Sequence, residues 1–193
     1  MSPEIPEALN VALEVVGVLD RLGIRYHLGG SYASSLHGVP RQTQDVDLVV
    51  DMGQNTVACF VEAVEAEFYV SEPAVREAIR NKSCFNLIHF NTAMKVDLFI
   101  SGDEPFDREE FHRHRLEVVD TETNCRVFVK TAEDILLRKL LWFKAGGEIS
   151  DRQWNDLLGI VRTQGERLDL EYTRHWAKAL NIETLLERLL ESD

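Results

Sequence analysis

Two aspartates stand two positions apart at the start of an apolar, β-branched run, in the segment DVDLVV that begins at Asp45. On a strand, side chains at positions i and i+2 leave the same face about 7 Å apart, so Asp45 and Asp47 can both reach one point. Two such carboxylates repel each other, and a strand is an unfavourable place for aspartate. A divalent cation removes both costs, and Mg²⁺ commonly takes one or two carboxylates together with substrate phosphates. The pattern therefore predicts a Mg²⁺ site for a substrate that carries phosphate.

A turn of small residues, Gly29-Gly30-Ser31, precedes this pair and ends fourteen positions before Asp45. Glycine lets the backbone bend sharply and approach a ligand closely. Serine is a favoured first residue of a helix, and the N–H groups at a helix start bind anions. Alone, the turn is typical of an ordinary helix cap. Together with Asp45 and Asp47, it indicates a phosphate-binding loop beside a metal site.

A third carboxylate, Asp97, lies in the segment KVDLFI, where a period of two puts Lys95 and Asp97 on one face of a second strand. A charge inside such an apolar run is costly without a partner. When two cations align an attacking hydroxyl and a leaving pyrophosphate, a third acid near the hydroxyl can act as a metal ligand or general base. We therefore expect Asp97 to complete the site. An ion pair with Lys95 is the structural alternative.

These residues resemble the signature of the nucleotidyltransferase superfamily typified by polymerase-beta-like enzymes. That signature is a Gly-Gly or Gly-Ser turn followed by a hydrophobic-Asp-hydrophobic-Asp-hydrophobic run, filled here by Gly30-Ser31 and by Asp45-Val46-Asp47. The resemblance implies transfer of an NMP from an NTP to a hydroxyl acceptor: an RNA end, a protein or a small molecule. It also implies two Mg²⁺ ions, with Mn²⁺ as the alternative, as cofactors held by Asp45, Asp47 and Asp97.

In the resembled superfamily a basic or hydroxyl residue often lies near the substrate just before the metal-binding strand. Arg41 and Thr43 occupy those positions here. A solvent-exposed turn is the other interpretation of both.

The second half of the chain narrows the resemblance to AbiEii-type nucleotidyltransferase-like proteins, a group that includes toxins of toxin–antitoxin systems. Four motifs carry the site in that group, and their counterparts here are the turn with the aspartate pair, Lys95-x-Asp97, Lys139 and Asp156. The resemblance implies nucleotide binding by these residues, with Lys139 as a point charge on the triphosphate. A lysine at the helix surface and an i,i+4 ion pair between Arg152 and Asp156 are the alternatives. The chain is shorter and more acidic than a protein that grips tRNA, which counts against tRNA as the acceptor.

Hydrophobic periodicity predicts an α+β fold. We expect helices over 8–22, 31–36, 54–67 and 73–80, strands over 24–28, 84–90, 93–100, 116–119 and 126–129, and a strand that carries Asp45 and Asp47. The polar segment 103–115, with its H-x-H motif, is predicted to be a solvated loop. From Thr131 onward only helices are predicted, with Thr131, Ser150 and Asp169 as caps. The predicted architecture is a nucleotidyltransferase-like mixed β-sheet with flanking helices, residues 1–130, followed by a C-terminal helical subdomain, residues 131–193.

Composition sets further bounds. The chain has 193 residues, 45% hydrophobic and 28% charged, with a formal net charge of −12. This charge argues against a broad DNA- or RNA-binding surface, which needs many Lys and Arg side chains. The three cysteines form no C-x-x-C pair and are predicted to be buried apolar thiols in a reducing compartment. No secretory leader pattern or bilayer-length apolar run is present, so we expect a cytoplasmic protein that does not bind membranes.

Two functions from different classes follow. The first is a Mg²⁺-dependent nucleotidyltransferase. The second is a binding or regulatory module of a toxin–antitoxin type system, with a partner protein and weak catalysis. The presence of all three carboxylates favours the enzyme.

Overall fold

The protein was analysed as a computed structural model, which describes residues 7–39, 45–120 and 124–192. The described residues belong to two compact units. The α/β unit takes its residues from Met1–Tyr32 and Gln42–Val129, and the helical unit takes its residues from Ala33–Arg41 and Lys130–Asp193. The division falls inside helix α2, Gly30–His37.

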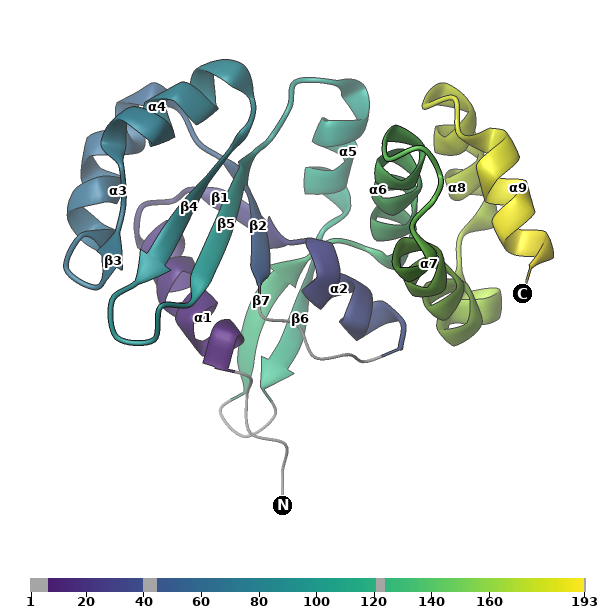
Figure 1. Ribbon diagram of the computed structural model, residues 1–193, viewed down its shortest axis with the longest axis horizontal. Coiled ribbons are helices and arrows are strands. Elements are labelled where there is room, and N and C mark those ends of the chain that lie inside the picture. The colour runs from purple at the N-terminus through teal and green to yellow at the C-terminus, as the bar shows by residue number, and fades with distance from the viewer. Residues whose placement is uncertain (1–6, 40–44, 121–123, 193) are drawn as a thin grey trace. The chain divides into compact units, whose positions relative to one another are not determined.

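The α/β unit is built on one mixed sheet (Figure 1). Its strand order is β3-β4-β5-β2-β1-β7-β6, in which β2 with β5 and β1 with β7 are parallel and the other neighbours antiparallel. The strands are β1 (Arg25–Leu28), β2 (Val46–Asp51), β3 (Phe68–Tyr69), β4 (Cys84–His89), β5 (Lys95–Ile100), β6 (Arg115–Asp120) and β7 (Cys125–Val129). The predicted α+β class with a mixed sheet is confirmed.

One face of this sheet is buried under helices. Helix α1 (Glu7–Arg21) packs on β1, β2 and β5, α3 (Val57–Val64) packs on α1, and α4 (Glu72–Asn81) packs on β4 and β5 (Figure 1). On β2, β4 and β5, successive side chains point to opposite faces of the sheet, so that every second one enters this core: Val46, Leu48, Val50, Phe85, Leu87, Val96, Leu98 and Ile100. The residues between them, which include Asp47 and Asp97, must then point to the opposite face.

The segment predicted as a solvated loop is helix α5, Pro105–Arg113, so that prediction was wrong. Proline stands in its first turn, and Glu104 forms a reciprocal capping box with Asp107. Phe106 and Phe111 are buried, and the Phe111 ring lies 4.5 Å from that of His27, which β1 turns to the same face of the sheet as Asp47. Burial of two aromatic rings stabilises a helix whose surface is otherwise charged.

The prediction of buried thiols was also wrong for two of the three cysteines. Cys59 and Cys84 are exposed, and Cys125 is half-buried. Cys84 belongs to the exposed set of the alternating strand β4, together with Asn86 and Ile88. Within the described ranges, no helix has the length and apolarity that crossing a bilayer requires.

The helical unit contains α6 (Ala132–Ala145), α7 (Asp151–Gln164), α8 (Leu170–Ala179) and α9 (Glu183–Glu191). The three predicted caps are confirmed: Thr131, Ser150 and Asp169 each accept a hydrogen bond from a backbone N–H three residues on. The last part of α2 also belongs to this unit. There the His37 carbonyl accepts a 2.6 Å hydrogen bond from the Gln164 amide.

Candidate active site

Asp47 and Asp97 lie side by side on neighbouring parallel strands. Asp47 of β2 and Asp97 of β5 are register partners, and both are half-buried on the face opposite to α1. Adjacent strands are about 4.8 Å apart, so the two carboxylates share one small region of that face. Asp45 directly precedes β2 instead of lying within it, and is exposed. The charges of Asp45 and Asp97 both act on Asp47.

The glycine turn packs directly against Asp47. Gly29 donates a 2.9 Å backbone hydrogen bond to the Asp47 carbonyl, and Ser31 donates its backbone N–H to the Asp47 carboxylate. Gly30 has φ +55°, and a Cβ built there would lie 1.6 Å from Asp47 Oδ2. Only glycine fits at this position, both for its backbone conformation and for its space. The turn therefore fixes Asp47 at the start of α2.

The electrostatics of Asp47 are those of a crowded anionic site. Burial raises the pKa of the Asp47 carboxyl, and the neighbouring Asp97 and Asp45 charges raise it further. The Ser31 N–H and Lys95 act in the opposite direction. A cation bound beside Asp47 would relieve both the burial cost and the repulsion.

Lys95 places a positive charge beside the carboxylates of Asp97 and Asp47. Its Nζ lies 2.8 Å from Asp97 Oδ2, with the lysine side chain 41% exposed and the aspartate side chain 18% exposed. The hydrogen bond to Asp97, together with the charges of Asp97, Asp45 and Asp47, raises the pKa of Lys95. The ion pair foreseen as the structural alternative for Asp97 is therefore present.

The donor set suits Mg²⁺, which prefers hard oxygen ligands and keeps several water or phosphate ligands. In the described ranges, no three His, Cys, Asp or Glu side chains are arranged as a metal site. Asp97 pairs with Lys95, and Asp47 accepts a hydrogen bond from the Ser31 N–H. Asp47 and Asp97 as neighbours, with Asp45 close by, are the residues that would hold a Mg²⁺ ion.

Lys139 and Asp156 lie in the helical unit and pair with each other. Lys139 Nζ donates to Asp156 Oδ2 at 2.8 Å, and the two side chains are 7% and 13% exposed. The sequence linked these two residues only through their shared resemblance, while the structure makes them partners. Arg41 and Thr43 lie outside the described residues.

Asn86 is a polar neighbour of the site that sequence analysis missed. It is the register partner of Asp97 on the antiparallel strand β4, and it is exposed on the same face. The alternating pattern of β4 indicates that Asn86 is exposed. That Asn86 lies on the same face as Lys95 and Asp97 follows only from the pairing of β4 with β5.

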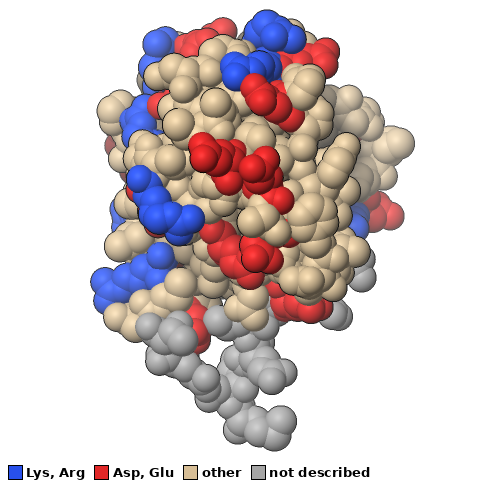
Figure 2. Space-filling view, turned by 90° about the vertical axis from the view of Figure 1, so that its left-hand side faces the viewer, with Lys and Arg blue, Asp and Glu red and all other residues tan. Residues whose placement is uncertain are grey.

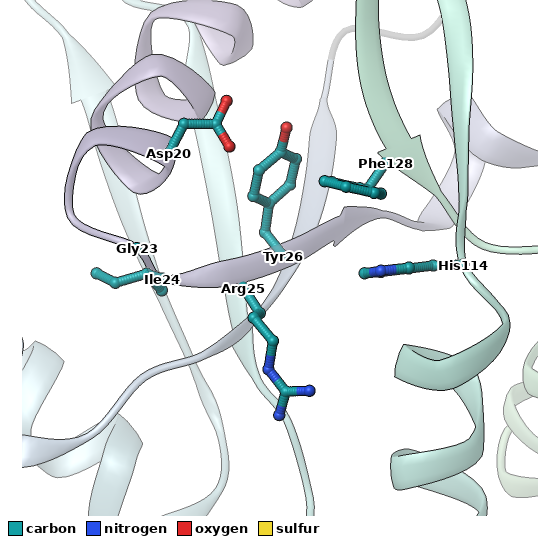
Figure 3. A pocket seen from close by; sticks show the side chains of 7 residues that line it. All are labelled: Asp20, Gly23, Ile24, Arg25, Tyr26, His114 and Phe128. Carbon is teal, nitrogen blue, oxygen red and sulfur yellow. The ribbon is translucent and has the colours of Figure 1, made fainter.

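A separate cavity of about 280 Å³ lies at the opposite end of β1 from the glycine turn (Figure 3). It is lined by Asp20, Gly23, Ile24, Arg25, Tyr26, His114 and Phe128. The Phe128 and His114 rings stack at 4.4 Å, and Figure 3 shows the Tyr26 hydroxyl pointing toward the Asp20 side. Burial and the Asp20 charge raise the pKa of Tyr26 to about 12. None of the candidate catalytic residues lines this cavity.

The side of the molecule that carries α3 and α4 is predominantly acidic down its middle (Figure 2). Exposed acidic residues of α3 and the turn after it are Glu62, Glu65 and Glu67. Lys and Arg side chains lie toward the edge and top of this view. This face is unsuited to broad contact with a nucleic-acid backbone.

Comparison with known proteins identifies the fold. No protein-family model matches the sequence, and no curated protein matches it. Among solved structures, ANT(2")-Ia in complex with adenylyl-2"-tobramycin matches with a TM-score of 0.58 and 11% identity, over 91% of this chain and 98% of that one. An antigenic nucleotidyltransferase-like protein from Paracoccidioides brasiliensis matches with a TM-score of 0.55 and 17% identity, over 98% and 95%. The lincosamide antibiotic adenylyltransferase LnuA, bound to lincomycin, matches with a TM-score of 0.52 and 11% identity, over 82% of this chain and 98% of that one. The chain therefore has the nucleotidyltransferase fold, as the sequence predicted.

Proposed function

We propose that the protein is a Mg²⁺-dependent nucleotidyltransferase that moves an NMP from an NTP to a hydroxyl acceptor. The observation that carries this proposal is the register pairing of Asp47 with Asp97 beside a turn in which only glycine fits at position 30. The fold is shared with ANT(2")-Ia and LnuA, an adenylyltransferase, and this supports the same class of reaction. The proposal includes a catalytic core, residues 1–130, and a helical subdomain, residues 131–193.

The turn would hold the phosphates of the NTP. Backbone N–H groups of Gly30 and Ser31 stand at the start of α2, where the helix dipole favours an anion. Ser31 now donates to Asp47, and this N–H can pass to a phosphate oxygen when a cation takes over the carboxylate. Lys95, close to all three carboxylates, would neutralise charge on the phosphates. Lys139 and Asp156, which the resemblance implies as nucleotide-binding residues, are proposed to assist in nucleotide binding.

Asp97 would position the acceptor hydroxyl and accept its proton. The acceptor oxygen attacks the α-phosphorus, a new P–O bond forms, and the bond to the bridging oxygen of pyrophosphate breaks. The hydroxyl proton goes to Asp97, and pyrophosphate leaves with the electron pair of the broken bond. Mg²⁺ bound by Asp45, Asp47 and Asp97 would supply charge stabilisation at the attacking and leaving oxygens.

The experiment that tests the proposal is label transfer. The protein is incubated with Mg²⁺ and NTP labelled at the α- or γ-phosphate, together with a cell extract separated into RNA, protein and small-molecule fractions. Transfer of α-label but not γ-label to one fraction, abolished by Asp47→Asn, supports nucleotidyl transfer. Asp51→Asn is the matched control, because Asp51 lies on the same strand but pairs with Arg25 at the surface.

The alternative is a catalytically weak module of a toxin–antitoxin type system, as the resemblance to AbiEii-type proteins suggests. It predicts a stable complex with a partner protein and no transfer of either label. That outcome would contradict the enzyme.

A further inference from the structure

The face of the sheet that carries the carboxylates continues past Asp97 onto β4 and β3. Asn86 is the register partner of Asp97, Ile88 is the partner of Lys95, and Tyr69 of β3 is the partner of Ile88. Register partners on neighbouring strands project to the same face. Phe90 follows β4 with the same alternation, and its N–H donates a 3.0 Å hydrogen bond to the Glu67 carbonyl. We name Tyr69, Asn86, Ile88 and Phe90 the β3–β4 strip.

Three members of this strip are large apolar side chains left in solvent. Tyr69 and Phe90 are each 58% exposed, and Ile88 is 38% exposed. Their neighbours along the chain, Phe68 and Leu87, are buried in the core. The strip is therefore fixed by buried residues beneath it, and it presents a rigid apolar surface. Grouped exposed apolar side chains of this kind mark binding surfaces.

The order of the strands gives this surface a role. The glycine turn adjoins β1 and β2, followed across the sheet by Asp47 on β2, Asp97 on β5 and the strip on β4 and β3. In phosphoryl transfer the attacking and leaving oxygens lie on opposite sides of the phosphorus. If the leaving phosphates occupy the glycine turn, the acceptor must approach from the opposite direction, over β5 and β4. The strip lies in that direction.

We propose that the β3–β4 strip binds the acceptor, and that the acceptor is a small molecule with a planar or apolar ring close to its hydroxyl. This inference rests on the proposed function. The strip consists of Tyr69, Asn86, Ile88 and Phe90 and contains no charged side chain. A nucleic-acid acceptor would need cationic side chains along the strip. An uncharged or cationic ring can pack on Tyr69 and Phe90 without them, with its hydroxyl near Asn86 and Asp97.

The test uses 2-naphthalenemethanol, a neutral planar probe with one hydroxyl, and α,β-methylene-ATP with Mg²⁺ as the nucleotide. Binding of each is measured separately, by calorimetry and by backbone amide shifts. Tyr69→Ala and Phe90→Ala should each weaken probe binding about three- to tenfold and leave nucleotide binding unchanged. Leu116→Ala is the matched control, since Leu116 is 50% exposed on β6, at the other edge of the sheet, and should change neither.

The outcomes separate the two proposals. Amide shifts that are centred on β3 and β4, together with weaker probe binding in both variants, support the strip as the acceptor site. Nucleotide binding without probe binding, or equal loss in the Leu116→Ala control, overturns the strip alone. Binding of an oligoribonucleotide with a free 3′ hydroxyl that depends on Tyr69 also overturns the small-molecule acceptor. A wild-type protein that binds no nucleotide contradicts the proposed function itself.

Discussion

Replacing Gly30 by alanine should remove nucleotide and metal binding by displacing Asp47. A Cβ at position 30 would lie 1.6 Å from Asp47 Oδ2, 2.5 Å from its Cγ and 2.9 Å from its Cβ. No rotation of the carboxylate about its own axis clears all three contacts, so the side chain must turn away or the strand must shift. Either movement separates Asp47 from Asp97 and from the Ser31 N–H.

The loss of stability in Gly30→Ala has two parts: backbone strain and the steric conflict with Asp47. The backbone strain is about 1–2 kcal/mol, because φ +55° is unfavourable for a residue with a Cβ. Substitution of Gly23 reports the backbone strain alone, because Gly23 has φ +65° and nothing lies within 4 Å of a Cβ built there. Gly23→Ala should therefore lower the free energy of unfolding by about 1–2 kcal/mol and leave ligand binding intact. Gly30→Ala should lose at least as much stability and lose binding as well.

The assay combines urea denaturation of the two variants with calorimetric titration of Mn²⁺ and α,β-methylene-ATP. The predicted result is destabilisation of both variants, at least as large in Gly30→Ala as in Gly23→Ala, and loss of ligand binding in Gly30→Ala only. Wild-type affinity in Gly30→Ala would refute the argument that the glycine turn and Asp47 form one site. Loss of binding in both variants would show that general destabilisation, and not the displaced carboxylate, is the cause.

Three further predictions concern the stability of the folded protein. The pKa of Tyr26 is raised from 10.0 to about 12 in the folded protein, so as the pH rises Tyr26 ionises in the unfolded chain before it does in the folded one. The free energy of unfolding should therefore fall by up to about 3 kcal/mol between pH 10 and 12. Tyr26→Phe should abolish this component in denaturant titrations, and an unchanged pH profile would contradict it. Lys139→Ala removes the ammonium that pairs with the largely buried carboxylate of Asp156, so the free energy of unfolding should fall by about 3–5 kcal/mol. The double variant Lys139→Met, Asp156→Leu should recover most of this loss. If Lys139→Ala destabilises the protein no more than substitution of an exposed surface lysine does, this reasoning is refuted. Tyr172→Phe removes a 2.6 Å hydrogen bond to the fully buried carboxylate of Asp134 and should cost about 1.5–3 kcal/mol in urea denaturation, so an unchanged midpoint would exclude that contribution.

The sequence predicted the parts of the fold that depend on local pattern. The alternation of Val46, Leu48 and Val50 around Asp47 indicated which face the carboxylate takes, and the structure has that arrangement. Caps such as Ser150 were visible because a short polar side chain stands directly before an apolar helical stripe. These signals involve residues within a few positions of one another.

Contacts between distant segments could not be predicted in the same way. The pairing of Asp47 with Asp97 requires β2 and β5 to become parallel neighbours, although two helices and two strands lie between them in the sequence. Helix α5 was missed because Phe106 and Phe111 stand five positions apart among charged residues, without a continuous apolar stripe. Burial of both rings, that of Phe111 against His27, supplies what the local pattern lacks.

The most direct test of the account is to locate the metal ion. Crystals grown with Mn²⁺ and α,β-methylene-ATP should show anomalous scattering from Mn²⁺ bound by carboxylate oxygens of Asp47 and Asp97, with the phosphates at the Gly30-Ser31 turn and the Lys95 ammonium moved from Asp97. Mn²⁺ and nucleotide bound elsewhere, with the contact between Lys95 and Asp97 still at 2.8 Å, would contradict the proposed active site.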